Sequence, residues 1–173
     1  MTAEQLAALE HAVRTLCQYL EAERASLERL STLLDEELAA LQNLDRERLT
    51  DLNTQKVQVL QAHQQLLLAR PWYLAPFSPQ AGATVSLSYI CTHLPVPFNG
   101  WVHAFQEALK ALAIEIKERQ ARNELRATTA REIIRSTRRN LEQKDPDHRR
   151  SRVYTARGKI RHRIPRGRGY GKG

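Results

Sequence analysis

The spacing of leucines in residues 27–70 constrains the fold of this chain more than any other feature. The leucines recur at intervals of three and four, which places them along one face of a helix and does not fit a strand. The members of this stripe are Leu27, Leu30, Leu34, Leu38, Leu41, Leu49, Leu52, Leu60 and Leu67. Because a helix with one apolar face needs a second helix to cover that face, the stripe predicts a coiled-coil-like pair.

The first of these helices is expected over residues 4–43, with Thr2 as its cap. Its apolar residues keep an unbroken heptad frame: Leu6, Leu9, Val13, Leu16, Leu20, Leu27, Leu30, Leu34 and Leu41. Glu23 and Glu37 occupy d positions of the same frame. A carboxylate there either lies at a solvated edge of the seam or reaches a partner across it. We favour the solvated edge as the commoner case.

The heptad frame slips at residues 43–45, and two interpretations compete. A four-residue stutter would continue one helix and shift the apolar stripe. Alternatively the chain turns, and Asp45 caps a second helix with Glu47 in its first turn, where the positive end of the helix dipole favours a carboxylate. We favour the turn, because it lets the two stripes face each other in an antiparallel hairpin. The second helix is then expected over residues 46–69, and Pro71 is expected to stop it.

Residues 71–99 change character, because they hold five of the seven prolines together with several aromatic residues. The run 84–90 alternates like a short strand, but an isolated strand has no sheet to join. We therefore expect a long loop, with room for one helical turn, packed by its aromatic side chains over the hairpin. Asn99 is the expected cap of a third helix over residues 100–141. The apolar stripe of that helix thins toward its end, which indicates a surface that a partner helix could complete.

Basic residues are concentrated at the C-terminal end of the chain. Of the net charge of +8, residues 1–137 contribute −2 and residues 138–173 contribute +10. Residues 142–173 have few apolar anchors and cannot bury enough surface to offset the entropy of ordering, so a disordered basic tail is expected. Such a tail could bind phosphates, which leaves a coiled-coil nucleic-acid-binding protein as the alternative function. The predicted organisation is an all-α domain, residues 1–141, made of an antiparallel helical hairpin plus a third long helix, followed by the tail.

Residue types that carry catalysis or bind metals form no recognisable constellation. The sequence has no phosphate-cradling glycine loop, no Cys/His ligand spacing and no common nucleophile or zinc motif, so we expect neither an enzyme nor a cofactor. Cys17 and Cys91 are far apart in sequence, and we expect two reduced, buried or half-buried thiols in a cytoplasmic protein. The acidic start argues against a signal peptide. The absence of a run of about 18 apolar residues argues against a membrane span.

A set of spaced residues carries a resemblance to a known family. The order is Leu30-x2-Leu33-Leu34-x2-Glu37-x3-Leu41-x3-Asp45-x3-Leu49-x6-Lys56-x3-Leu60, then Asn123 in the third helix, then Tyr154-x3-Gly158. This pattern resembles that of the FlgN family of bacterial flagellar export chaperones, over about residues 27–70 and 101–158. The helical part is common to many coiled coils. The more specific part is the order of Glu37, Asp45, Lys56, Asn123 and the Tyr154–Gly158 motif.

The resemblance implies a chaperone that binds the C-terminal helical segments of hook-associated (hook–filament junction) proteins in the cytoplasm. It would keep them unassembled and deliver them to the flagellar type III export gate. The residues expected to bind this cargo are Leu109, Leu112, Ile116, Asn123 and Ile133. Tyr154, Arg157 and Gly158 are expected to dock on the export gate. Pairing with a second copy of the chain as a homodimer stays open.

Overall fold

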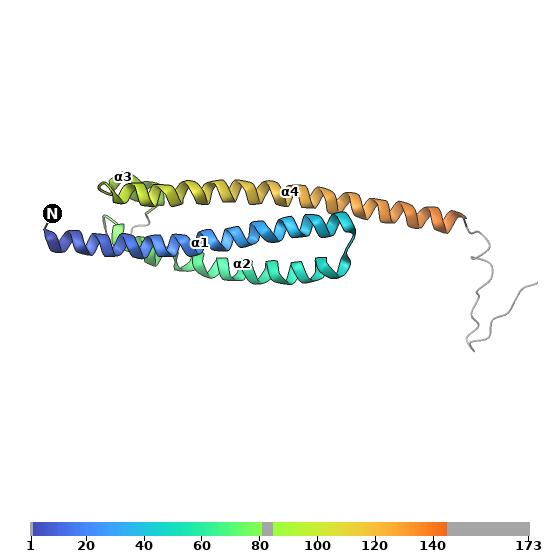
Figure 1. The fold of residues 1–173 in the computed structure, drawn as a ribbon, viewed down its shortest axis with the longest axis horizontal. Coiled ribbons are helices and arrows are strands. Elements are labelled where there is room, and N and C mark those ends of the chain that lie inside the picture. The colour runs from blue at the N-terminus through green and yellow to red at the C-terminus, as the bar shows by residue number, and fades with distance from the viewer. Residues whose placement is uncertain (1, 81–84, 145–173) are drawn as a thin grey trace, which may run out of the picture. The chain divides into compact units, whose positions relative to one another are not determined.

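The structure, a computed structural model, describes residues 2–80 and 85–144 of the chain. Its elements are α1 (Ala3–Asn43), α2 (Arg46–Leu74), the 3-10 turn η1 (Ala75–Phe77), α3 (Leu87–His93) and α4 (Phe98–Lys144). The described residues contain no strand, which confirms the predicted all-α fold class. Figure 1 shows α1 and α2 as an antiparallel hairpin, with the first part of α4 running alongside α1.

Both ends of α1 are defined by local hydrogen bonds and backbone conformation. The Thr2 side chain accepts a hydrogen bond from the Gln5 N–H at 3.2 Å, and the Gln5 side chain accepts from the Thr2 N–H at 2.9 Å, a reciprocal capping box. After α1, Leu44 adopts a left-handed conformation with φ 54°. The Asp45 carboxylate then accepts from the Arg48 N–H at 3.0 Å and caps α2. The predicted turn is therefore confirmed and the continuous stuttering helix is excluded.

The end of α2 differs from the prediction, because Pro71 lies inside the helix instead of stopping it. A proline removes one backbone donor, but packing can outweigh that loss near a helix end. The ring of Tyr73 stacks on that of Tyr19 in α1 with centroids 4.5 Å apart, and Leu74 is buried in the core. The Ala75 N–H donates to the carbonyl of Pro71, so the last turn keeps its hydrogen bonds.

The expected long loop over residues 71–99 contains more helix than the single turn predicted for it, because it includes the end of α2, η1, α3 and the start of α4. Residues 87–90 of the strand-like run belong to the short helix α3. Its first turn is capped by the Ser86 side chain, which accepts from the Tyr89 N–H at 3.1 Å. A short apolar run cannot by itself distinguish a strand from a buried helical turn. Helix α4 begins at Phe98, so Asn99 lies within it and is not its cap. Residues 81–84 lie outside the described part.

Two apolar clusters hold the helices of the first 128 residues together. The larger one draws on α1, α2, α3 and α4 and on two residues that flank α3. It consists of Val13, Leu16, Tyr19, Leu20, Leu74, Val85, Leu87, Ile90, Leu94, Phe98, Val102 and Leu109. The smaller one, near the hairpin turn, consists of Leu33, Ala40 and Leu52. Each large side chain that is fully buried contributes about 1.5–3 kcal/mol. As predicted, aromatic residues of the segment 71–99 pack on the hairpin, among them Tyr73, Phe77 and Tyr89, although Trp72 is 69% exposed.

The chain divides into two compact units, Met1–Thr128 and Thr129–Gly173. Helix α4 contributes residues to both units, and the boundary predicted at residue 141 stays a prediction. The predicted disordered tail, residues 142–173, lies outside the described residues apart from the last three residues of α4. Among the described helices, none combines the length and the apolar character needed to cross a bilayer.

Candidate functional site

A polar layer in the first unit joins the three long helices through one residue from each. Glu37 of α1 forms an ion pair with Lys56 of α2 and accepts a hydrogen bond from the Asn123 side chain of α4 at 2.9 Å. The Asn123 amide also donates to the Leu34 carbonyl at 2.7 Å. Both carboxylate oxygens of Glu37 are therefore engaged, while its side chain is only 14% exposed. We refer to Glu37, Lys56 and Asn123 as the Glu37 layer.

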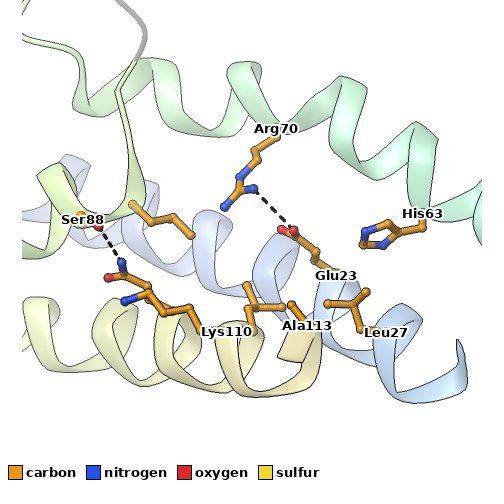
Figure 2. Close-up of a pocket in the computed structure, with 10 residues that line it drawn as sticks. Glu23, Leu27, His63, Arg70, Ser88, Lys110 and Ala113 are labelled. Atoms are coloured by element: carbon orange, nitrogen blue, oxygen red, sulfur yellow. Dashed lines mark hydrogen bonds and ion pairs between the residues drawn. The ribbon is translucent and has the colours of Figure 1, made fainter. Parts of the chain in front are cut away.

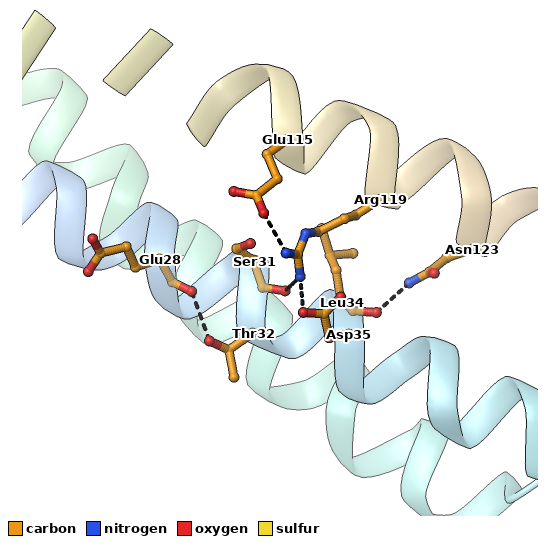
Figure 3. A network of polar contacts seen from close by, with 8 residues as sticks. All are labelled: Glu28, Ser31, Thr32, Leu34, Asp35, Glu115, Arg119 and Asn123. Carbon is orange, nitrogen blue, oxygen red and sulfur yellow. Dashed lines mark hydrogen bonds and ion pairs between the residues drawn. The ribbon is translucent and has the colours of Figure 1, made fainter. Parts of the chain in front are cut away.

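Arg119, one turn before Asn123, strengthens the same contact between α4 and α1 (Figure 3). Its guanidinium pairs with Asp35 of α1 and with Glu115 of its own helix, and it also donates to the Ser31 carbonyl at 3.4 Å. These bonds and those of Asn123 show that α4 runs parallel to α1, because higher numbers in one helix meet higher numbers in the other. The middle of α4 is thus held to the hairpin by hydrogen bonds and charge.

A second layer with the same helix register lies two heptads away. Fourteen residues before Glu37 is Glu23, fourteen after Lys56 is Arg70, and fourteen before Asn123 is Leu109. Glu23 is only 5% exposed, and its Oε1 lies 3.6 Å from the Arg70 guanidinium. Glu23 Oε2 has no hydrogen-bond partner among the described residues. We refer to Glu23, Arg70 and Leu109 as the Glu23 layer.

A pocket of about 430 Å³ opens beside the Glu23 layer, between α2 and α4 (Figure 2). Its lining comes from all four α-helices: Glu23, Leu27, His63, Arg70, Leu87, Ser88, Gln106, Leu109, Lys110 and Ala113. His63 lies one heptad from both Lys56 and Arg70, and its buried Nδ1 also lacks a partner among the described residues. Ser88, Lys110 and Ala113 are exposed and form the rim. The pocket is thus open to solvent and combines an apolar wall with a few polar groups.

Two polar side chains near Glu23, those of Gln106 and Tyr19, have hydrogen-bond partners of their own. The Gln106 amide donates to the Ser88 hydroxyl at 2.6 Å, and its carbonyl accepts from the Cys91 thiol at 3.3 Å. The Tyr19 hydroxyl donates to the Leu66 carbonyl at 3.0 Å. Burial and, secondly, the nearby charge of Glu23 raise the pKa of Tyr19 well above its ordinary value of 10.0.

The predicted solvated position of Glu23 and Glu37 was wrong, since both carboxylates reach partners across the seam. One sequence signal could have shown this. In an antiparallel hairpin, equal separations on the two helices bring matching residues together, and Lys56 and Arg70 are as far apart as Glu23 and Glu37. Two acids and two bases with the same spacing therefore indicated two ion pairs.

The structure separates the predicted cargo-binding residues into three kinds. Leu109 and Asn123 are buried, at 8% and 5% exposure. Leu112 and Ile116 are half-buried, and Ile133, in the second unit, is 54% exposed. The docking residues Tyr154, Arg157 and Gly158 lie outside the described part. The roles assigned to all eight residues stay predictions.

The two cysteines are free and half-buried, as expected. Burial raises the pKa of both thiols, those of Cys17 and Cys91, and therefore lowers the fraction of reactive thiolate at neutral pH. In the described residues, no group of three or more His, Cys, Asp or Glu side chains is arranged to hold a metal ion.

Exposed apolar side chains continue along α4 beyond the polar layers. Ile133, Ile134 and Leu141 are each more than half exposed and recur at helical spacing in the part of α4 that belongs to the second unit. Exposed aliphatic side chains grouped on one helix are typical of a surface that binds another helix.

Comparison with known proteins gives one family and no individual relative. The chain matches the family described as FlgN protein over residues 4–162. No curated protein and no solved structure matches it. FlgN proteins are a family of chaperones in flagellar export rather than a family of enzymes. Because the match spans most of the 173 residues, this chain belongs to the FlgN family of flagellar export chaperones.

Proposed function

We propose that this protein binds the C-terminal helical segments of hook-associated proteins in the cytoplasm, keeps them unassembled and delivers them to the flagellar type III export gate. Family membership supports the export role. The observation that carries the choice of a helical client is the exposed row of Ile133, Ile134 and Leu141 on α4. A client helix that would polymerise with its own kind can be shielded by such a row without ATP chemistry.

The exposed row alone is too small for tight binding. Complete burial of a large aliphatic side chain contributes about 1.5–3 kcal/mol, and these three side chains are already partly covered. A micromolar complex needs about 8 kcal/mol in addition to the cost of association. The client must therefore make further contacts. Leu112 and Ile116, half-buried in the first unit, are the proposed additional apolar contacts. Leu109 and Asn123 are buried on the same helix, and their proposed part is to hold that helix in place against the hairpin.

The binding test uses synthetic peptides with the C-terminal sequences of hook-associated proteins from the same genome. Isothermal titration against the full chain should give dissociation constants below about 10 μM. The double variant Ile133→Ser and Ile134→Ser should weaken binding at least tenfold. Its matched control is Glu132→Ser with Arg135→Ser, which changes two polar neighbours, leaves the net charge unchanged and should bind normally. Absence of peptide binding to the unaltered protein at tens of micromolar would contradict the proposal.

Delivery to the export gate is proposed to depend on Tyr154, Arg157 and Gly158, by the motif resemblance. The variant Tyr154→Ala should bind client peptides as the unaltered protein does, while secretion of hook-associated proteins falls. Loss of peptide binding in this variant would instead assign Tyr154 to the structure of the client site. A variant of nearby Tyr170, Tyr170→Ala, lies outside the motif and serves as the control for secretion.

A further inference from the structure

We propose that the pocket beside Glu23 binds a carboxamide side chain, Asn or Gln, presented by a helix of the client. This inference rests on the proposed function for the identity of the helix, but not for the chemistry of the pocket. The helix would lie over the space between α2 and α4, where Ser88, Lys110 and Ala113 form an exposed rim. The group would enter beside the unpartnered Oε2 of Glu23.

The first argument is the unpaired carboxylate oxygen. A buried acceptor left without a hydrogen bond costs about 1–3 kcal/mol, and more when it is charged. Glu23 is 95% buried, yet its Oε2 has no partner among residues 2–80 and 85–144. A donor that enters the pocket recovers this free energy, so the pocket favours ligands that can donate a hydrogen bond.

The second argument is the comparison with the Glu37 layer. There the glutamate has one basic partner from α2 and one carboxamide partner, Asn123, from α4. In the Glu23 layer the basic partner Arg70 is present, whereas Leu109 stands where Asn123 would be and cannot donate. The Glu37 layer therefore indicates which group the Glu23 layer lacks, and that group is a side-chain amide.

The third argument is charge. The pair of Glu23 and Arg70 is already neutral, and so is the ion pair of Lys110 and Glu107 at the rim. A cation or an anion would therefore give up its hydration shell without meeting a net opposite charge, which costs more than it does for a neutral polar group. A carboxamide is neutral, donates two hydrogen bonds to acceptors such as Oε2, and offers a carbonyl to His63 or Lys110. The volume of about 430 Å³ leaves room for such a side chain together with several waters, each needing about 30 Å³.

The chemistry of the pocket is tested without a client. The probes are propionamide, propionate and propylammonium, titrated into isotope-labelled full-length protein while the side-chain resonances of Glu23 and His63 are followed by NMR. Propionamide should shift both resonances in a saturable way, and the two charged analogues should shift them at least fivefold less. If water alone satisfies Glu23, propionamide will not shift the two resonances, and this result would overturn the proposal. An equal response to all three probes would overturn it as well.

A variant with a larger side chain at the rim, together with a matched control, tests whether the propionamide-induced shifts arise from binding in the pocket. Ala113→Leu adds three carbon atoms at the rim without removing any polar group, and Ala111→Leu adds the same atoms at an exposed position of α4 outside the lining. The propionamide shift should disappear in the first variant and persist in the second. Persistence in both variants would show that the probe binds elsewhere.

The identity of the occupant is tested with the client peptides. Replacing each Asn and Gln of a bound peptide by Ala should reveal one position that costs about tenfold in affinity, and this loss should vanish in the Ala113→Leu protein, as expected for a double-mutant cycle. Peptides that bind without any such position would overturn the client amide while leaving the proposed function intact. A specific propionamide response with no peptide binding would reject the proposed function and leave only the pocket's preference for amides.

Discussion

The Glu37 layer and the Glu23 layer use the same three helices in the same register, yet one is complete and the other is not. Both have a glutamate on α1 and a basic residue on α2. They differ at the third position, where Asn123 satisfies Glu37 and Leu109 leaves Glu23 Oε2 without a partner among the described residues. Leu109 instead joins the large apolar cluster.

The difference separates two tasks within one bundle. A polar group whose partners all come from its own chain fixes helix register, whereas a polar group left incomplete beside an open pocket is available to a partner. The Glu37 layer therefore serves the fold, and the Glu23 layer is the one we assign to recognition.

The largest effect is expected for Asn123→Leu, which converts the Glu37 layer into a copy of the Glu23 layer. The change removes the bonds to Glu37 and to the Leu34 carbonyl and leaves Glu37 Oε2, an acceptor in a mostly buried carboxylate, without its amide donor. The free energy of unfolding should fall by about 2–4 kcal/mol, measured by urea denaturation. The exposed Gln120→Leu on the same helix is the control and should change stability by less than about 0.5 kcal/mol.

The next largest effect is a difference between Glu37→Gln and Glu23→Gln in how they change the free energy of unfolding. Glu37→Gln should lower the free energy of unfolding by about 1–2 kcal/mol, because the charge that pairs with Lys56 is lost in a mostly buried setting. Glu23→Gln should change it by less than about 0.5 kcal/mol or raise it, because an incompletely satisfied buried charge is removed. Equal losses in the two variants would contradict the assignment of the layers.

A smaller effect concerns stability at alkaline pH and reports on Glu23. Because the folded-state pKa of Tyr19 is raised, the unfolded chain loses that proton first, so stability is retained below pH 10 and falls as pH rises above it. The slope contributed by this residue should be at most about 1.4 kcal/mol per pH unit, and Tyr19→Phe should remove it. Glu23→Gln should lower the pKa of Tyr19, measured by ultraviolet titration of tyrosinate. Glu37→Gln should leave that pKa unchanged, and a shift in that variant would contradict the separation of the two layers.

The smallest effect is on the rate of cysteine alkylation. It tests whether the Gln106 side chain, which lines the pocket, is hydrogen-bonded to Cys91. Burial raises the pKa of Cys17 and Cys91, so both should react with iodoacetamide at pH 7.5 roughly tenfold more slowly than in the unfolded chain. Gln106→Leu removes the acceptor of the Cys91 thiol and should change the rate at Cys91 alone, with Cys17 as the internal control. Equal rate changes at both thiols would indicate general loosening instead.

Periodicity and capping chemistry predicted most of the fold. The leucine spacing predicted the hairpin, and Thr2 and Asp45 marked helix starts that the structure confirms. Pro71 and Asn99 were misjudged because local preferences were outweighed by packing, through Tyr73 and Leu74 in one case and Phe98 in the other. Local rules describe isolated segments, and these residues are governed by distant neighbours.

The candidate site was harder to predict, because it depends on helix register. Glu23 and Glu37 were recognised as unusual, but their partners are about 20 to 85 residues away in sequence. The unpaired oxygen of Glu23 and the pocket beside it follow from how α4 lies against α1, which periodicity alone does not define. Asn123 was identified through its family position, and only the structure shows that it binds Glu37.

The left-handed residue Leu44 and the cap at Asp45 determine more than a change of direction. They set the alignment of one arm of the hairpin against the other, so Lys56 and Arg70 meet their acids only for this length of connection. One added residue in the bend would rotate the second arm by about 100°, or else slide it by one position, and would uncouple both pairs at once. The turn between α1 and α2 therefore fixes the register of the whole hairpin, including the side chains that face each other about 40 Å away at its far end.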